Sequence, residues 1–210
     1  GCFVFLFVLV LIRMIYENKH FVVTEYTIRD AHLPKNFHGH TWLLLADLHN
    51  CSYGANNEQL IQKIKELAPS AIFVAGDTIV KSKPGIDNAL SLFAGIKDVA
   101  PIYYVNGNHE EKVKTFLEDG GAYYKDYCGM LKKMGITMVN NSCASLKDND
   151  EKVFIHGLNL DLSYYEKRKK ELPKDRIDKF ADRSSFNQYD ILLAHNPEYF
   201  KEYSEYGVNL

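Results

Sequence analysis

Four apolar runs rich in β-forming residues each end at a polar side chain that can bind a metal. Runs of this kind, separated by helical patterns, are typical of an α/β fold with parallel strands. In an open α/β sheet, ligands bind outside the carboxyl ends of the strands. We therefore expect the polar residues that follow the runs to converge in one crevice. The runs cover residues 41–46, 70–75, 102–105 and 189–194, and the polar residues are Asp47, His49, Asp77, Asn108, His109 and His195.

The remaining periodicity predicts one α/β domain over residues 20–210. Apolar residues at helical spacing mark a helix face between residues 60 and 68. Further helices are predicted at 86–97 and 124–134, and short strands at 21–28, 136–139 and 153–156. The charged stretch 166–183 has helical spacing and is interpreted as a solvated surface helix, with a lid or substrate loop as the alternative.

Composition limits the function classes. With 210 residues, 46% of them hydrophobic, the chain can bury a sizeable core. A formal net charge of −2 gives no polybasic argument for nucleic acid, so no nucleic-acid partner is expected. The four cysteines form no C-x-x-C pair and no zinc-ribbon spacing.

The first residues are strongly apolar from Cys2 to Ile12. A membrane span needs about 20 apolar residues and a signal h-region about 7–15, so residues 1–16 fit a partial membrane anchor or a signal h-region. A buried strand or helix is the alternative. Because no small-x-small cleavage site follows, we favour an uncleaved anchor in the cell membrane, with its orientation open.

The residue types suit two divalent ions. Two metals about 3.5–4 Å apart can clamp a phosphate and lower the pKa of a bridging water. Asp77 is the candidate bridging anion, because Gly76 before it allows close backbone approach. Asp47 and His49, two residues apart, are expected to point the same way from an extended strand end and to reach one metal.

The other metal is assigned to Asn108, through its amide oxygen, and to His195. His109 cannot easily share the direction of Asn108, so we assign it to protonation of the leaving group or to contact with the phosphate. Glu110 is a candidate for orienting His109, although a helix-starting role explains it equally well. Mn, Fe or Zn suit this ligand set, and its residues alone do not choose among them.

The motifs Asp47-Leu48-His49, Gly76-Asp77, Gly107-Asn108-His109-Glu110 and His195 occur in this order, about one strand–helix unit apart. In this the chain resembles the calcineurin-like metallophosphoesterase superfamily over about residues 20–210, and most of all its bacterial, membrane-anchored, phosphodiesterase-type branch. The resemblance implies a four-layer α/β sandwich with two central sheets. It also implies a binuclear metal centre with the ligand roles given above, and hydrolysis of phosphate esters by a metal-bridged hydroxide, with phosphodiesters or pyrophosphates as the expected substrates.

One motif of the family is missing. A G-H-x-H block completes both metal sites in the family, and residues 205–210 look like the opening of the strand that leads to it. We therefore expect a C-terminally truncated copy of the sandwich that lacks its last strands, binds metal weakly and is poorly active.

Two other classes of function stay open. One is a membrane-anchored domain of the same fold without turnover, and the other is a nuclease-type two-metal hydrolase. An apolar anchor beside a catalytic domain favours a substrate at the membrane surface, such as a lipid-linked or cell-envelope phosphate. Among the other histidines, His38 and His40 are expected in a surface loop, while His156 is a weaker candidate for a wall of the site.

Overall fold

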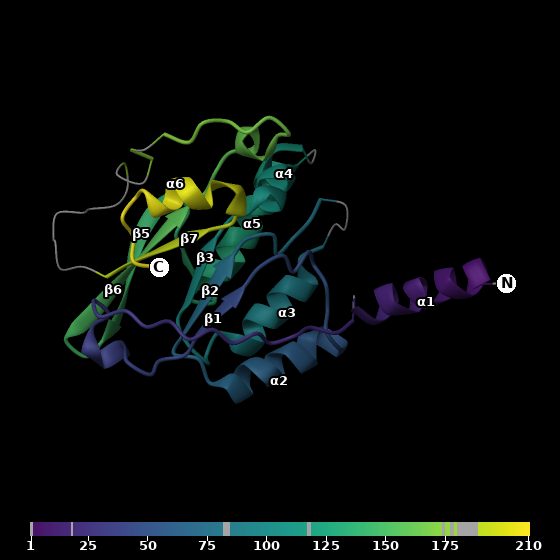
Figure 1. The fold of residues 1–210 in the computed structure, drawn as a ribbon, viewed down its shortest axis with the longest axis horizontal. Coiled ribbons are helices and arrows are strands. Elements are labelled where there is room, and N and C mark those ends of the chain that lie inside the picture. The colour runs from purple at the N-terminus through teal and green to yellow at the C-terminus, as the bar shows by residue number, and fades with distance from the viewer. Residues whose placement is uncertain are drawn as a thin grey trace.

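The computed structural model describes residues 2–17, 19–81, 85–116, 119–173, 175–176, 179 and 189–210. Its strands form two sheets (Figure 1). The first is parallel, in the order β1 (Trp42–Leu45), β2 (Ala71–Ala75), β3 (Ile102–Val105) and β4 (Thr137–Met138). The second has the order β5 (Ser142–Asp148), β6 (Glu151–Leu158) and β7 (Asp190–Ala194), with β5 antiparallel and β7 parallel to β6.

Helices connect and cover these strands. The α-helices are α1 (Cys2–Glu17), α2 (Glu58–Leu67), α3 (Asp87–Ile96), α4 (Asn108–Phe116), α5 (Gly120–Lys133) and α6 (Phe200–Ser204). Short 3-10 helices are η1 (Lys35–Phe37), η2 (Ala55–Asn57), η3 (Leu162–Tyr165) and η4 (Pro197–Tyr199). Figure 1 shows α2 and α3 on one side of the sheets and α6 on the opposite side.

Three apolar clusters define four layers. On β2, Ile72 and Val74 pack against helices, whereas Phe73 faces the second sheet, because successive side chains of a strand point to opposite faces. A further cluster covers the outer face of the second sheet with residues from η4 and the segment after α6, among them Tyr199 and Tyr206. The order is therefore helix, sheet, sheet and helix. Strands buried on both faces read as continuous apolar runs, which is why the pattern in the sequence was so clear.

The predicted α/β class and four-layer architecture are confirmed. The predicted strands at 41–46, 70–75 and 102–105 correspond to β1, β2 and β3, with small shifts at their ends. The fourth run corresponds to β7, which lies in the second sheet. Its end still reaches the others because the two sheets pack face to face, with contacts between β2 and β7.

Two predicted elements differ from the structure. Residues 21–28 form no strand, and Val22 and Tyr26, on one face of the expected strand, are 87% and 85% exposed. Their alternation therefore does not mark a buried face. No helix occurs among the described residues of 166–183, although residues 166–171 are exposed to solvent as predicted. Lys169 pairs with Glu202 of α6 at 2.6 Å. The rest of that stretch lies outside the described residues.

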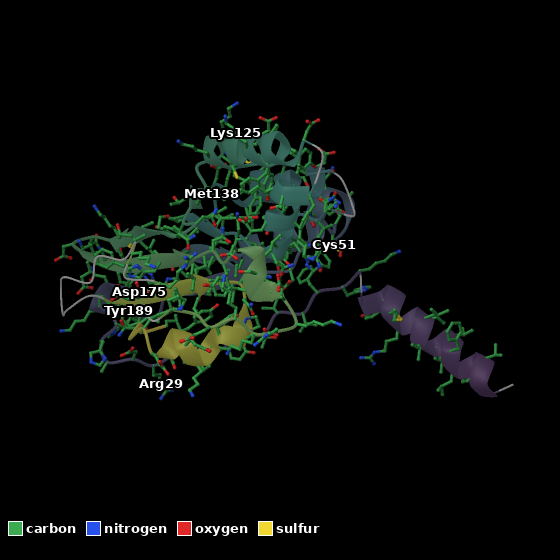
Figure 2. All side chains as sticks on the ribbon, turned by 90° about the horizontal axis from the view of Figure 1, so that it is seen from above. Arg29, Cys51, Lys125, Met138, Asp175 and Tyr189 are labelled. Carbon is green, nitrogen blue, oxygen red and sulfur yellow. The ribbon has the colours of Figure 1, made fainter. Side chains whose placement is uncertain are left out.

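Helix α1 extends away from the rest of the chain (Figures 1 and 2), and its side chains from Val4 to Ile12 are exposed. In the part of the chain that the structure describes, no helix is both long and apolar enough to cross a bilayer. The predicted anchor over residues 1–16 therefore gains no support from the structure and stays a prediction.

The last residues lie beside β7. The backbone N–H of Leu210 donates to Asp190 O at 3.2 Å, and that of Leu192 donates to Leu210 O at 2.7 Å. This is the hydrogen-bond pattern of a parallel neighbour.

Candidate metal centre

The loops after β1 and β2 are joined backbone to backbone. The N–H of Asp47 donates to Gly76 O at 3.2 Å, and the N–H of His49 donates to Asp77 O at 2.8 Å. Asp47, His49 and Asp77 all have left-handed backbones, with φ of 54°, 49° and 54°. Such φ values are uncommon outside glycine and cluster at functional sites.

These φ values correct one prediction. Asp47 and His49 do not leave an extended strand end side by side, because the chain turns left-handed at both residues. Their side chains nevertheless meet, with Asp47 Oδ1 3.5 Å from His49 Nε2. The strained turn, and not strand alternation, brings them together.

Two glycines allow the loops to approach. Gly76 has φ of 76°, and a Cβ there would collide with the backbone of Gly107. A Cβ on Gly107 would in turn collide with the Asp77 carboxylate. The close approach predicted at Gly76 is confirmed. At Gly107 a residue without a Cβ is needed because the Asp77 carboxylate occupies that space.

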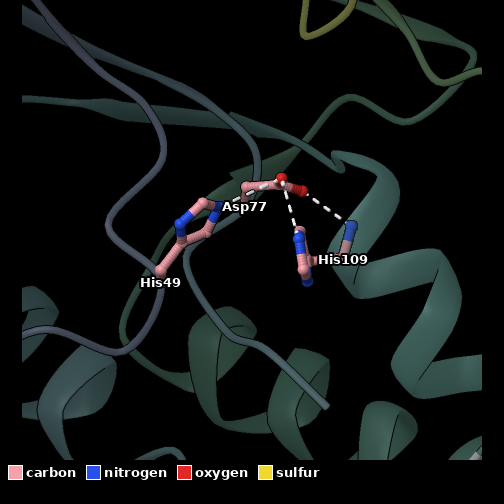
Figure 3. A group of neighbouring side chains, drawn as sticks. All are labelled: His49, Asp77 and His109. Atoms are coloured by element: carbon pink, nitrogen blue, oxygen red, sulfur yellow. Dashed lines mark hydrogen bonds and ion pairs between the residues drawn. The ribbon is translucent and has the colours of Figure 1, made fainter. Parts of the chain in front are cut away.

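Asp77 lies at the centre of the site and is almost fully buried. Its Oδ2 is 3.3 Å from His49 Nε2, 3.2 Å from His195 Nε2 and 3.9 Å from His109 Nε2. Its Oδ1 accepts a 2.7 Å hydrogen bond from the backbone N–H of His109, at the start of α4. Figure 3 shows the side chains of His49 and His109 next to each other, both directed at this carboxylate.

His195 is oriented by a second contact. Its Nδ1 is 2.7 Å from the carbonyl oxygen of Ala75, which directs Nε2 toward Asp77 and toward Asn108 Oδ1 at 3.2 Å. A backbone carbonyl bound to the far ring nitrogen is the usual support of a metal-ligating histidine. Burial acts to lower the pKa of His195, but the hydrogen bond and charge of Asp77 outweigh it and raise the pKa to about 9.

The other titratable groups respond to the same contacts. Burial acts to raise the pKa of Asp77, yet its hydrogen bonds with His195 and the His109 backbone lower the pKa overall. Burial lowers the pKa of His109. The carboxylate is therefore ionised and ready to bind a cation at neutral pH.

Two groups of donor atoms can hold metal ions, and Asp77 belongs to both. One group is His49, Asp77 and His109, and the other is Asp47, Asp77 and His195, with the donor atoms of each group within 4.8 Å of one another. Carboxylate, amide and imidazole donors suit Mn, Fe or Zn. The residues present thus fit a divalent metal, while the number of ions and the role of each residue stay predictions.

Glu110 does not contact the His109 side chain as one of the two predictions held, but it does start helix α4, where it accepts from the Gly107 backbone N–H at 2.9 Å. It is fully buried and makes no hydrogen bond to His109 among the described residues. Its carboxylate accepts hydrogen bonds from the backbone N–H groups of Asp77, Thr78, Ile79 and Gly107 and from the hydroxyls of Thr78 and Tyr104, at 2.7–3.2 Å. It therefore fixes the loop that carries Asp77, and it acts on His109 only through that loop.

Two neighbours of the site were not predicted. The ring of Tyr165, in η3, lies 6.0 Å from that of His195, and burial together with the charge of Asp77 raises its pKa. Lys112 lies on α4 with its ammonium beside the Asn108 amide. The i, i+4 spacing of Asn108 and Lys112 was a signal for the second residue, whereas no local pattern marks Tyr165.

The other histidines lie elsewhere. His40 Nε2 is 3.3 Å from Asp148 at the end of β5, and His38 contacts Leu33 O, so both lie away from the site as expected. His156 is buried in the second sheet, where Nε2 is 2.7 Å from Asp190 Oδ1. It contacts that aspartate and not a predicted site residue.

An α/β sandwich with imidazole and carboxylate donors at its strand ends is the arrangement of a metal-dependent hydrolase. Residues 40–209 match the model of the calcineurin-like phosphoesterase family, and the chain belongs to that family. The predicted resemblance is thereby confirmed.

Two known proteins are similar to this chain. An uncharacterized metallophosphoesterase of Helicobacter pylori (strain ATCC 700392 / 26695) is 24% identical over 171 residues, which cover 78% of this chain and 40% of that protein. The chain thus spans about two-fifths of the length of this relative. The crystal structure of phosphopantetheinyl hydrolase (PptH) from Mycobacterium tuberculosis aligns over 80% of this chain and 75% of that one, with 16% identity and a TM-score of 0.43.

Proposed function

We propose that this chain carries the catalytic centre of a phosphoesterase that uses two divalent ions to hydrolyse phosphodiesters or pyrophosphates. The observation that supports this most directly is the membership of Asp77 in both groups of candidate ligands. A carboxylate has two oxygens, so one aspartate between two cations can bind both and offset their repulsion.

In this proposal Asp47 and His49 would hold one ion and Asn108 and His195 the other, with Asp77 shared. The donor groups themselves place His49 with His109 and Asp47 with His195, so they support the shared Asp77 and not this division of the other ligands. When bound, the ions neutralise phosphoryl oxygens and lower the pKa of a water molecule. The protein supplies the positions: the loop fixed by Glu110 holds Asp77, and the carbonyl of Ala75 holds His195. Prepositioned donors of this kind avoid reorganisation during the reaction.

His109 is assigned to the proton or to the phosphate. Its ring lies beside that of His49, with the centroids 4.8 Å apart, and its backbone N–H is fixed on Asp77. Burial lowers its pKa in the metal-free chain, and a phosphate anion beside the ring would favour the protonated form. Arrival of the substrate thereby creates the acid that the leaving oxygen requires.

A substrate at a membrane surface is proposed on separate grounds. The apolar side chains of α1 are exposed and extend from the domain, and such a surface favours contact with lipid. We therefore propose a membrane-attached protein with a lipid-linked or cell-envelope phosphate as its substrate. Activity on detergent-dispersed lipid phosphodiesters that does not exceed activity on soluble nucleotides would contradict this part alone.

The central test is hydrolysis of bis(p-nitrophenyl) phosphate by the protein as its native gene encodes it, with Mn²⁺, Fe²⁺ or Zn²⁺ added in turn. We expect Asp77→Asn to lower kcat/KM by at least about 10³-fold, because it removes the shared anion. Asp98→Asn is the matched control, since this carboxylate is exposed and pairs with Lys97. Equal activity of Asp77→Asn and wild type, or no metal-dependent activity in the wild type, would overturn the proposal.

A further inference from the structure

Lys112 is placed to act on the same amide that we assign to a metal. Asn108 and Lys112 are four residues apart on α4, so their side chains share one face of the helix. With Asn108 Oδ1 3.2 Å from His195 Nε2, the amide nitrogen is directed toward the Lys112 ammonium. Two donors then face each other, which is unfavourable.

The opposite amide orientation removes this conflict. After a 180° turn, the amide oxygen accepts from Lys112 Nζ at 3.0 Å and from the His109 backbone N–H at 3.3 Å. The nitrogen then lies 3.2 Å from His195 Nε2 and donates to it when the imidazole is unprotonated, the form that a metal requires. A hydrogen bond to an ammonium group is about twice as strong as a neutral one. When His195 is unprotonated, as metal binding requires, the oxygen of Asn108 therefore pairs with Lys112 until the metal arrives.

A cation between Asn108 and His195 reverses the preference. It attracts the amide oxygen, and the amide nitrogen then faces Lys112 again. The ammonium loses its acceptor and needs another, because a charged donor beside a partly buried site is costly when unpaired. Lys112 follows His109 by three residues on the same helix, so a phosphate bound at His109 offers the nearest new oxygen atoms.

We propose that Lys112 binds a phosphoryl oxygen of the substrate, and that it competes with the metal for the Asn108 oxygen until the metal is bound. The inference rests on the proposed function, since it requires a metal at Asn108 and a phosphate at His109. It makes Lys112 a substrate-binding residue whose availability depends on metal loading.

Calorimetry with Mn²⁺ and inorganic phosphate tests this without turnover, on the protein as its native gene encodes it. We expect Lys112→Met to bind Mn²⁺ as tightly as the wild type or up to about tenfold more tightly, because a competitor is gone. In the Mn²⁺-loaded protein it should bind phosphate at least about tenfold more weakly. Lys112→Arg should keep phosphate binding within about threefold, because it keeps the charge.

The matched control is Lys114→Met. Lys114 lies on the same helix but is half exposed and 3.5 Å from Glu111, so both affinities should stay within about twofold of the wild type. Weaker Mn²⁺ binding by Lys112→Met, or unchanged phosphate binding, would overturn the inference while leaving the proposed function intact. A wild type that binds Mn²⁺ but no phosphate, or that binds no Mn²⁺, would overturn both.

Discussion

Strand β7 carries a histidine–aspartate contact at each of its ends, and the two contacts differ in their surroundings. At the amino end, Asp190 Oδ1 is 2.7 Å from His156 Nε2. At the carboxyl end, His195 Nε2 is 3.2 Å from Asp77 Oδ2. The two ends are about 16 Å apart along an extended strand of this length.

The amino-end contact is structural. His156 is buried on β6, and the backbone of Asp190 is bound by Asn209 and Leu210. One imidazole nitrogen and one carboxylate oxygen pair there, while among the described residues the other ring nitrogen of His156, Nδ1, has no hydrogen-bond partner. Among the groups of donor atoms that the described residues offer to a metal, none includes this pair.

At the carboxyl end, more nitrogen and oxygen atoms that can bind a metal come together than can pair with one another. Three imidazoles surround Asp77, and the amide of Asn108 and the carboxylate of Asp47 add further acceptors. The difference between the ends is therefore not the residue pair but the convergence of several loops. A histidine beside an aspartate is a candidate metal site only where further imidazole, carboxylate or amide groups lie next to the pair.

The largest expected effect comes from removing each aspartate in turn. Asp77→Asn should weaken Mn²⁺ binding by at least about 100-fold, because loss of even an outer-shell partner costs about 10–100-fold. Asp190→Asn should leave Mn²⁺ affinity within about twofold and instead lower the free energy of unfolding by about 1–3 kcal/mol, because it weakens a buried hydrogen bond.

Titration calorimetry and urea unfolding measure the two quantities separately. A large loss of metal affinity in Asp190→Asn would contradict the comparison, since the amino-end pair would then contribute to the site.

The next effect concerns the support beneath Asp77. Glu110→Gln replaces an acceptor of six hydrogen bonds by an amide with one donor group facing backbone N–H groups. We expect it to lower the free energy of unfolding by about 2–4 kcal/mol and to weaken Mn²⁺ binding as well.

Glu66→Gln is the control for Glu110→Gln, because Glu66 is exposed and its contacts, with Lys63 at 3.7 Å and with the Gln62 amide at 3.0 Å, lie on the helix surface. Its change should stay below about 0.5 kcal/mol. Equal stability of the two variants in urea unfolding would show that the buried carboxylate does not hold the loop.

These contacts explain what the sequence could predict. Strands β2 and β3 are buried on both faces and are therefore visible as continuous apolar runs. The runs of β1 and β7 are also mainly apolar although these strands are only partly buried, and the polar residues after all four runs mark the strand ends. The positions of Asp77 and His195 at neighbouring strand ends follow from that pattern and from the parallel arrangement of strands.

The unpredicted part depends on distant contacts. Glu110 begins a helix in the sequence, but its partners at Asp77 and Thr78 lie 32–33 residues away. The placement of β7 in a second sheet depends on its pairing with β6, and β5 was not predicted. The left-handed turns at Asp47 and His49 occur without glycine. Asp and His adopt this backbone region more often than most residues, but the preference is too weak to place the turns from sequence.

The smallest effect is a pH dependence at the carboxyl end of β7. In the metal-free protein the pKa of His195 is raised to about 9 from its ordinary 6.5. Burial acts to lower this pKa, but the hydrogen bond to Asp77 and the charge of Asp77 raise it by more. A raised pKa stabilises the fold fully below the unfolded pKa, and this stability is lost as the pH rises through the folded pKa. The free energy of unfolding should therefore fall by about 1–3 kcal/mol between pH 6.5 and 9.

His195→Gln should flatten the pH dependence, because glutamine does not titrate, whereas His156→Gln should leave it in place. Saturating Mn²⁺ should reduce or reverse the slope, since metal binding requires the unprotonated imidazole and therefore strengthens as the pH rises. Unfolding in urea at several pH values, with and without Mn²⁺, measures both slopes. An unchanged slope in His195→Gln would mean that His195 does not hold its proton through Asp77, and the contrast between the two ends of β7 would then rest on the converging donors alone.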